Sequence, residues 1–271
     1  MSHFTVAVIT KNKPDECDIS DILAPYDENL VVEQYVRYTK TEIIKNARKQ
    51  LEYYKTDGAY AEYLKDPEKY EKDHPNPEHL EYVKEGFMKK YNMSDEELYK
   101  EEISYYDEDE IDENGGILST YNPKSKWDWY SIGGRWSYEI PVKEGVTPSD
   151  TLQIKDIEFG NDITVEEYLK KNPGVKQRYD DLMSGKDTIY NVKYLKERYP
   201  SLEVYVEELK NFVTFAIITP DGEWHEQGKM GWFGMSTATP NTENIWTSDF
   251  YDKFISKLPP EYYFTLVDCH I

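Results

Sequence analysis

The chain has 271 residues, of which 53 are acidic and 32 are basic, giving a formal net charge of −21. A field of this sign repels phosphate backbones and anionic lipid surfaces, so direct binding to duplex nucleic acid or to a membrane is not expected. The length is sufficient for a sizeable core, so burial of apolar side chains does not limit the fold.

The number and spacing of the cysteines, together with the absence of long apolar stretches, indicate the cellular compartment in which the protein is expected. Cys17 and Cys269 are the two cysteines, and they lie near opposite ends of the chain without metal-ligand spacing. Neither a disulfide framework nor a structural zinc is therefore expected. Residues 1–30 lack the features of a signal peptide, and no window approaches the roughly 20 apolar residues that span a bilayer. The sequence predicts a soluble cytoplasmic protein.

The first part of the chain predicts a strand followed by helices. Residues 4–10 read FTVAVIT, a β-branched and aromatic run typical of a buried strand, and a short helix is expected at 20–24. Further on, apolar residues recur every fourth position at Ile43, Ala47 and Leu51, with charged residues between them. This spacing predicts amphipathic helices over roughly 40–106.

An acidic run occupies residues 94–113, with eleven acidic side chains against the single base Lys100. Such a run could be a metal site, a surface that mimics nucleic acid, or a solvated helix face. Blocks of like charge usually stay solvated, and the glycine-punctuated spacing of a calcium loop is absent. We therefore expect the run to be exposed and dispensable for folding.

The remainder of the chain alternates between short strands and a second helical block. Strands are predicted at 117–121, 127–132, 136–142, 212–219, 223–227 and 263–271, and helices over 163–209 and 244–258. A turn at 220–222, Pro-Asp-Gly, joins two of the strands into a hairpin. The pattern predicts an α+β fold in a single domain, 1–271. Its central antiparallel or mixed sheet carries two charged helical insertions, at 40–116 and 163–209.

The segment 122–136, NPKSKWDWYSIGGRW, holds three of the six tryptophans within ten residues, beside a Gly-Gly pair and an arginine. If 127–131 is a strand, Trp127 and Trp129 point to one face while Asp128 and Tyr130 point to the other. One face would then be apolar and the other polar.

The same segment offers the groups that a nucleotide-like ligand requires, which are rings for stacking and donors for phosphate. Glycines permit close backbone approach, and an arginine presents a planar set of donors to phosphate. The ligand-binding candidates are Lys126, Trp127, Trp129, Tyr130, Gly133, Gly134, Arg135 and Trp232. In the structural alternative the tryptophans fill the core and Arg135 pairs with a surplus acid. The spacing matches neither a Walker loop nor a dinucleotide fingerprint, so no cofactor is indicated.

Both ends of the chain add candidates for chemistry. In 265–271, TLVDCHI, Asp268 and His270 fall on one strand face, where a carboxylate can hold the tautomer of an imidazole for acid–base catalysis. A pair that serves only solubility is an equal alternative. His3-Phe4-Thr5 has the His-x-Thr spacing of two-histidine phosphoesterases, but no second His-x-Ser/Thr occurs among the five histidines. His225-Glu226 lacks the second histidine of a zinc-protease helix, so no metal site is predicted.

The order of these pieces resembles a family of uncharacterised proteins encoded by bacteriophages and some bacteria. The matching pieces are MSHFTVAVI and LAPYDEN near the start, PKSKWDWYSIGGRW in the middle, and GKMGWFG and VDCHI at the end. They cover the predicted sheet core and leave out both helical blocks. The resemblance implies a setting in the host cytoplasm, with interference in host enzymes or defence signalling, and it carries over no catalytic residue.

Two classes of function follow. In the first, a phage-type accessory protein binds a small phosphorylated or nucleotide-like ligand to counter host defence signalling. It either sequesters the ligand or hydrolyses it with Asp268 and His270. In the second, the acidic helical blocks bind and inhibit a host protein, presenting carboxylates as nucleic acid presents phosphates. The sequence leaves open whether a reaction is catalysed.

Overall fold

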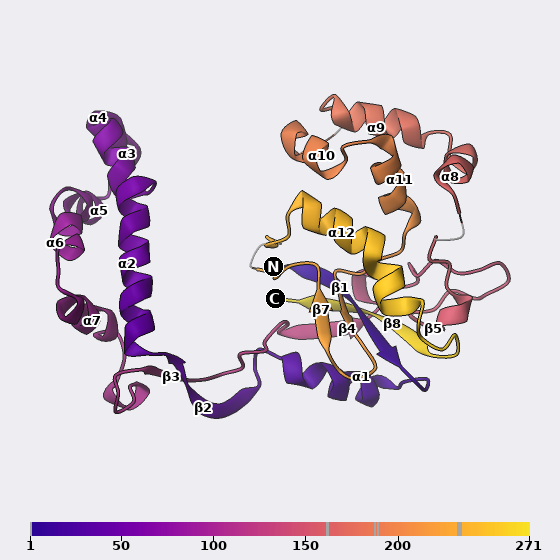
Figure 1. The fold of residues 1–271 in the computed structure, drawn as a ribbon, viewed down its shortest axis with the longest axis horizontal. Helices are drawn as coiled ribbons and strands as arrows, with labels where there is room; N and C mark the ends of the chain where they lie inside the picture. Colours follow the sequence, from indigo (N-terminus) through magenta and orange to yellow (C-terminus); the bar gives the residue numbers. More distant parts are fainter. Residues whose placement is uncertain (1, 161–162, 187, 189, 232–234) are drawn as a thin grey trace. The chain divides into compact units, whose positions relative to one another are not determined.

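The computed structural model describes residues 2–160, 163–186, 188, 190–231 and 235–271. The chain divides into two compact units (Figure 1). The sheet unit contains Met1–Leu30 and Asn122–Ile271, and the helical unit contains Val31–Tyr121. About 47% of the chain is helical and 19% is in strands, with a mixed six-stranded sheet, so the predicted α+β class is confirmed.

The sheet unit is built on a mixed sheet with the order β4-β8-β1-β6-β7, in which β5 also pairs with β8. The strands are β1 (His3–Thr10), β4 (Trp129–Ile132), β5 (Thr151–Gln153), β6 (Ala216–Ile218), β7 (Trp224–Glu226) and β8 (Tyr263–His270). β1 pairs with β8 antiparallel along its whole length and with β6 in parallel. The last strand is therefore internal, as its apolar run predicted, because β1 covers one of its edges and β4 and β5 cover the other.

Helices cover both faces of this sheet. On one face, α1 (Glu16–Leu23) packs Ile19 and Leu23 with Val6 and Val8 of β1. On the other face lies α12 (Pro240–Phe250), which begins at the Thr239 capping box and continues into a π-helical turn, Tyr251–Ile255. Within the described ranges, no helix is both long enough and apolar enough to cross a membrane.

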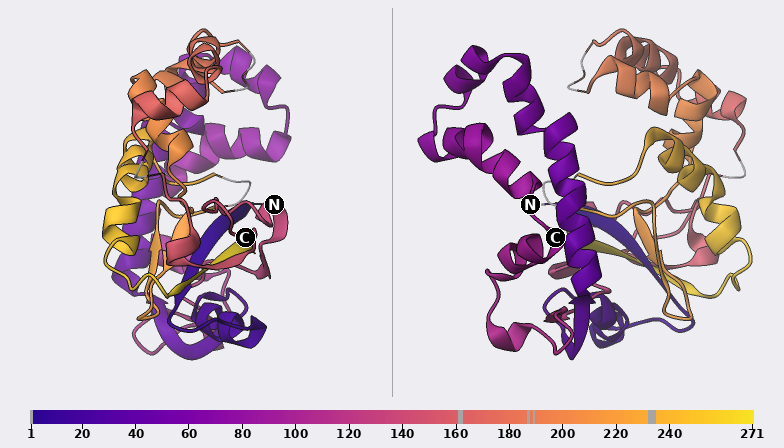
Figure 2. Two further views of the ribbon diagram at one scale, coloured as in Figure 1. Left: turned by 90° about the vertical axis from the view of Figure 1, so that its right-hand side faces the viewer. Right: turned by 60° about the vertical axis from the view of Figure 1, so that its left-hand side comes forward.

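The second helical block stacks on α12. It consists of α8 (Val165–Lys171), α9 (Val175–Met183), α10 (Val192–Arg198) and α11 (Leu202–Lys210), of which α10 and α11 contact α12. Figure 2 shows these helices on the side of α12 that is away from the sheet. An ion-pair network ties them to it, because the Arg198 guanidinium binds Glu208 on α11 at 2.6 Å and Glu243 on α12.

The helical unit combines a long helix with a two-stranded sheet. Its elements are β2 (Val31–Tyr38), α2 (Lys40–Thr56), α3 (Ala59–Lys65), α4 (Pro67–Asp73), α5 (Pro77–Glu81), α6 (Phe87–Tyr91), α7 (Asp95–Ile103) and β3 (Ile117–Tyr121). The predicted strand at 117–121 forms, but it pairs with β2 instead of joining the central sheet. β2 was not among the predicted strands.

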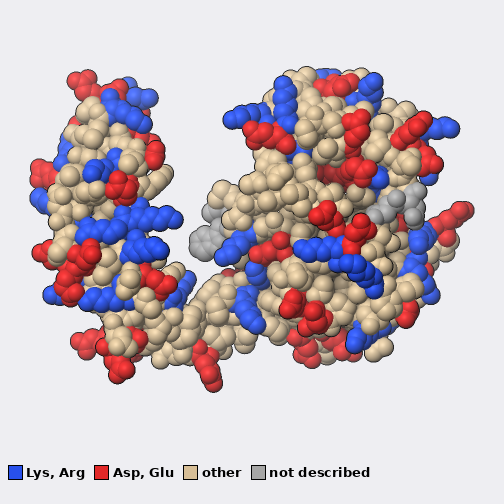
Figure 3. Space-filling model, in the orientation of Figure 1, with Lys and Arg blue, Asp and Glu red and all other residues tan. Residues whose placement is uncertain are grey.

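The acidic run of 94–113 has two roles in this unit. Its acidic side chains are exposed or half-exposed, as expected, and Figure 3 shows basic side chains mixed with acidic ones over the visible face of each unit. The run also places Leu98 and Tyr99 in the apolar clusters of the unit. Lys90 pairs with Glu101 and Glu102 at 2.8 and 2.9 Å. That the run is dispensable for folding stays a prediction, and the burial of Leu98 and Tyr99 in these clusters argues against it.

Two further expectations are corrected or refined around the sheet. The predicted strand at 136–142 is replaced by a 3-10 turn, Gly134–Trp136, followed by Tyr138 in the left-handed region with φ of 64°. The predicted hairpin at 212–227 is confirmed, with β6 and β7 paired antiparallel around the turn.

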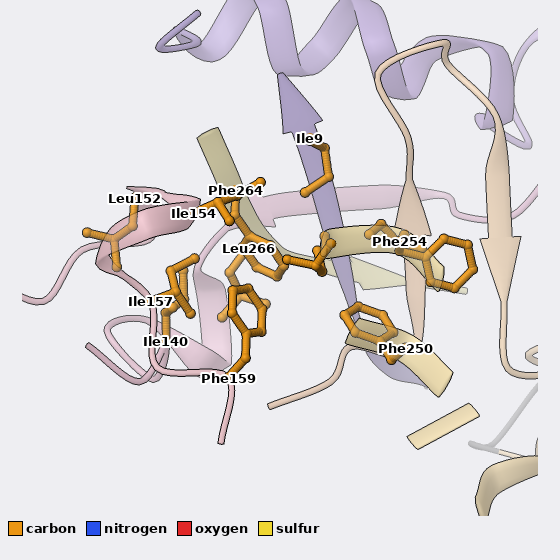
Figure 4. Close-up of a cluster of buried hydrophobic side chains, with 13 residues drawn as sticks. Ile9, Ile140, Leu152, Ile154, Ile157, Phe159, Phe250, Phe254, Phe264 and Leu266 are labelled. Carbon is orange, nitrogen blue, oxygen red and sulfur yellow. The ribbon is translucent and has the colours of Figure 1, made fainter. Parts of the chain in front are cut away.

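The α12 face of β1 and β8 holds the largest apolar cluster of the sheet unit, shown in Figure 4. Ala7 and Ile9 of β1 and Phe264 and Leu266 of β8 pack there against Phe250. Because side chains alternate along a strand, the same face continues toward the chain termini through four polar residues. These are His3 and Thr5 on β1, and Asp268 and His270 on β8.

Candidate functional site

Two histidines lie side by side where β1 and β8 reach the chain termini. His3 and His270 face each other in the strand register, with ring centroids 4.9 Å apart and ring planes at 70°. Their side chains are 7% and 8% exposed. Ser2 and Ile271 exchange backbone hydrogen bonds of 3.2 and 3.1 Å just beyond them. The histidine pair is therefore held by regular strand pairing on both sides.

Each imidazole has its own carboxylate. Nδ1 of His3 lies 2.8 Å from Oδ1 of Asp268, and Nδ1 of His270 lies 2.5 Å from Oδ1 of Asp128. An ionised carboxylate only accepts hydrogen bonds, so each neutral ring donates from Nδ1 and keeps its lone pair on Nε2. The pairs have the form in which an aspartate orients a catalytic imidazole.

The expected partnership of Asp268 with His270 does not form, and each residue instead takes a partner from a neighbouring strand. Residues two apart along a strand are separated by about 7 Å. Residues opposite each other on neighbouring strands approach to about 5 Å, and diagonal neighbours stay within reach of long side chains. Asp268 therefore binds His3 of β1, and His270 binds Asp128 from the segment that precedes β4.

The Nε2 atom of His270 is buried, and no described residue forms a hydrogen bond with it. Buried polar atoms in native proteins are nearly always paired, so an unpaired one calls for an explanation. Trp129 stacks on the same ring, with centroids 5.3 Å apart and an interplanar angle of 19°, and is itself 45% exposed. The indole thus shields one side of His270 and leaves part of its own surface open.

The Gly133-Gly134 pair brings the backbone against Asp268. Both residues lie in the left-handed region, with φ of 65° and 53°. A Cβ atom on Gly134 would lie only 2.4 Å from Cβ of Asp268. This approach lets the backbone N–H of Arg135 donate to Oδ2 of Asp268 at 3.0 Å. The glycines thus permit a close backbone approach, as the sequence predicted. The group approached is the Asp268 carboxylate of the protein, whereas a ligand was expected from the sequence.

Arg135 is exposed on the turn after β4. Only its backbone is engaged, since no described residue forms an ion pair or a hydrogen bond with its guanidinium. In a chain with 53 acids and 32 bases, a structural arginine would readily find a carboxylate. The guanidinium donors of Arg135 are therefore available to an external anion.

The two tryptophans predicted to share a face are separated. Trp127 is buried, donates from Nε1 to the carbonyl of Leu23 at 3.2 Å, and meets Tyr130 edge-on at 5.2 Å. Trp127 and Tyr130 pack in the cluster on the α1 side, whereas Trp129 stacks on His270. The alternation prediction was wrong because β4 begins at Trp129, while Trp127 precedes it in an isolated bridge to Asp27.

Lys126 lies in a different place from Arg135. Its Nζ pairs with Oε1 of Glu226 at 2.7 Å, and it lines a pocket of about 190 Å³ together with Phe4. Arg135 does not line this pocket, so the structure does not join the two cations in one site. Trp232 lies outside the described residues.

The residues that sequence reasoning missed are His3 and Asp128. In the sequence, His3 stands out only as half of an incomplete His-x-Thr motif, and Asp128 was assigned to the face opposite Trp129. The available signal was the pair of apolar strands that begin and end the chain, each with a histidine near the terminus. Antiparallel pairing of such strands brings their outer ends together.

No group of three or more His, Cys, Asp or Glu side chains that could hold a metal ion occurs in the described part of the chain. No protein-family model, curated protein or solved structure matches the chain. A functional conclusion therefore depends on the geometry of the two His–Asp pairs.

Proposed function

We propose that the protein binds a small phosphorylated, nucleotide-like ligand at the His3–His270 cluster and hydrolyses a phosphate ester bond in it. The observation that carries this proposal is the buried Nε2 of His270, which has no hydrogen-bond partner among the described residues and lies beside a second His–Asp pair. A carboxylate on Nδ1 fixes the tautomer in which Nε2 is the base. The same carboxylate stabilises the imidazolium that forms when Nε2 takes a proton.

The two imidazoles can divide the acid and base roles of a hydrolysis. His270, in the neutral form, removes a proton from water as the water oxygen bonds to phosphorus. His3, in the protonated form, donates its proton to the leaving oxygen as the ester P–O bond breaks. Exchange with solvent then returns both rings to their starting protonation states. A positioned acid or base contributes about 10²–10⁴-fold to such a rate.

Trp129 and Arg135 would supply the contacts that bind the ligand at this pair. The half-exposed indole of Trp129, already stacked on His270, provides a surface for a base. The guanidinium of Arg135, which pairs with no described residue, suits phosphate oxygens, and the backbone of Arg135 is anchored to Asp268 of the cluster. The side chains that bind the ligand and the histidines that act on it would then form one site.

In the setting that the sequence resemblance implies, the ligand would be a nucleotide signal of host defence in the host cytoplasm. The alternative, an acidic inhibitor that binds a host protein as a nucleic-acid mimic, has less support. Basic residues of the helical unit already pair with the acidic run, including Lys40 with Glu96 and Arg48 with Asp95, both at 2.8 Å. These ion pairs reduce the free negative charge that such a surface would present.

The test of the proposal replaces His270 by asparagine. An asparagine amide can still donate to Asp128 from near the position of Nδ1, but it has no atom at the position of Nε2. Nucleotides, cyclic nucleotides and ADP-ribose derivatives are screened by thermal shift, and products are followed by phosphorus NMR. We expect His270→Asn to lose about 10²–10⁴-fold in hydrolysis while keeping a melting temperature close to that of the wild type.

His225→Asn is the matched control, because His225 is a partly buried strand histidine that contacts Phe254 outside the cluster. It should hydrolyse the ligand as the wild type does. A ligand that stabilises the wild type without being converted would limit the function to sequestration. If no ligand stabilised the wild type and His270→Asn strongly lowered the melting temperature, the cluster would be structural and the protein-binding alternative would move ahead.

A further inference from the structure

Strand β2 of the helical unit has an open edge. In the described part of the chain it pairs with β3 alone, in a two-stranded sheet. Two strands by themselves form a marginal sheet, which gains stability from a third strand or from packing. An open edge also presents a row of unpaired backbone N–H and C=O groups, to which another strand can add.

This edge lacks two of the features that keep strands from pairing with other chains, although it carries charged side chains and register shifts. β2 reads VVEQYVRY, with neither proline nor lysine. Its side chains include exposed apolar groups, with Val31 at 75% exposure and Val36 and Tyr38 also exposed. The β2–β3 ladder has register shifts between Val31 and Tyr35 and between Val36 and Tyr38, so its regular stretch is Tyr35–Val36. The centre of β2 is thus the part most suited to a new partner.

The sequence of β2 is complementary to itself when two copies run antiparallel with Tyr35 at the two-fold axis. Each Glu33 then faces an Arg37 of the other copy, and each Val32 faces a Tyr38. Opposite charges directly across an antiparallel pair stabilise it, whereas like charges destabilise it. Any shift of the register from this centre removes the Glu33–Arg37 opposition.

Both charges are available for this pairing. Glu33 forms no ion pair with a described residue, and the Arg37 guanidinium lies over the rings of Tyr38 and Tyr121 at 5.5 and 5.6 Å. Two copies that each carry a net charge of −21 repel each other at a distance. A second copy can therefore bind at this edge only where local charge pairing offsets the repulsion. The two Glu33–Arg37 pairs provide that local attraction.

We propose that the chain forms a two-fold dimer through antiparallel β2–β2 pairing centred on Tyr35. The two ribbons then become one four-stranded sheet, and the apolar side chains beside the edge are partly covered. This proposal does not rest on the proposed hydrolysis, because β2 belongs to the helical unit and the histidine cluster to the sheet unit.

Charge reversal tests the pairing in the full chain, with molar mass followed by sedimentation velocity across a concentration series. The wild type should pass from 32.0 kDa to twice that mass. Glu33→Arg and Arg37→Glu should each raise the dissociation constant by about tenfold or more, and the double variant should restore it. An equimolar mixture of the two single variants should form a heterodimer, since one supplies two bases and the other two acids at the facing positions.

Cross-linking tests the register, in a Cys17→Ser background that removes the exposed thiol. Tyr35→Cys should form an intermolecular disulfide on mild oxidation, because Tyr35 faces its own copy at the axis. Gln34→Cys is the matched control and should not, because Gln34 faces Val36 and the substitution leaves the Glu33–Arg37 pairs intact. A monomer at all concentrations, or a dimer that neither charge reversal weakens, would overturn the proposal. So would slow exchange, in a monomer, of the β2 amides that point away from β3, because a segment of the same chain would then cover this edge.

Discussion

One face of strands β1 and β8 changes character part-way along the sheet. Toward one end it carries Ala7, Ile9, Phe264 and Leu266, which pack beneath α12. Toward the chain termini it carries His3, Thr5, Asp268 and His270. The strand pairing is continuous through both halves, so the side chains alone make the difference.

The two halves satisfy their buried groups in different ways. Burial of the apolar half is favourable by itself, whereas a buried polar group costs free energy unless it is hydrogen-bonded. Asp268 meets this condition with acceptor contacts at both oxygens, but Nε2 of His270 has no hydrogen-bond partner in the described part of the chain. Natural proteins tend to break such rules at functional sites. Under the proposed function, the apolar half provides stability and the polar half keeps a group for chemistry.

The largest expected effect on stability belongs to the apolar half. Phe264 is fully buried in the cluster under α12, and Phe264→Ala should lower the free energy of unfolding by about 3–5 kcal/mol. Urea denaturation followed by circular dichroism measures this loss. The fraction that remains folded should still bind the ligand, because the substitution leaves the histidine cluster intact. A loss below about 1 kcal/mol would contradict the assignment of this half as the main core.

Asp268→Ala should have the next largest effect on stability. The substitution removes the acceptor of two N–H groups, on His3 and on the backbone of Arg135. Each donor left buried without a partner costs about 1–3 kcal/mol. Asp128→Ala should cost less, because the side chain of Asp128 is 28% exposed and water can replace it. Equal losses for the two variants would mean that both carboxylates are equally structural.

Arg135→Ala should affect ligand binding and leave the fold intact. The guanidinium contacts no described residue as an ion pair, and the backbone bond to Asp268 survives the substitution. We expect a loss of about 1.5–3 kcal/mol in binding, as for a hydrogen bond to a charged group, measured by titration calorimetry. Lys126→Ala is the control, because Lys126 pairs with Glu226 in another pocket. A comparable loss with Lys126→Ala would place both cations in one site.

The smallest effect concerns Cys269, which lies between Asp268 and His270 but points to the opposite face of β8. Burial, and next the charge of Asp268, raise the pKa of its thiol. Ellman's reagent should therefore modify the exposed Cys17 in the native protein and reach Cys269 only after unfolding. Rapid modification of two thiols in the native protein would show that the terminal strand opens.

The same shift has a consequence for stability at alkaline pH. The folded protein holds the Cys269 proton more tightly than the unfolded chain, because the folded pKa lies above the ordinary value of 9.0. The contribution of the thiol to stability is therefore full below that pH and falls as the pH rises above it. Cys269→Ala should remove this part of the alkaline loss in unfolding experiments on either side of the ordinary thiol pKa.

The sequence by itself determined the elements whose signals are local. The apolar run of β1 and the turn at 220–222 depend only on residues a few positions apart, and so do the capping boxes at Ser94 and Thr164. The same holds for the presence of a polar cluster near the C-terminus, since Asp268 and His270 must share a face of any strand that contains both. Local periodicity therefore gave the α+β class and half of the candidate site.

Only the tertiary structure decided which groups meet. The His3–Asp268 bond joins residues 265 positions apart, and a shift of one residue in the β1–β8 register would turn one side chain of this pair to the other face. Strand 117–121 likewise lies outside the central sheet, because it pairs with β2. Strand pairing depends on the whole set of strands that come together, so neither the His–Asp partners nor the two-unit division could be read from any one segment.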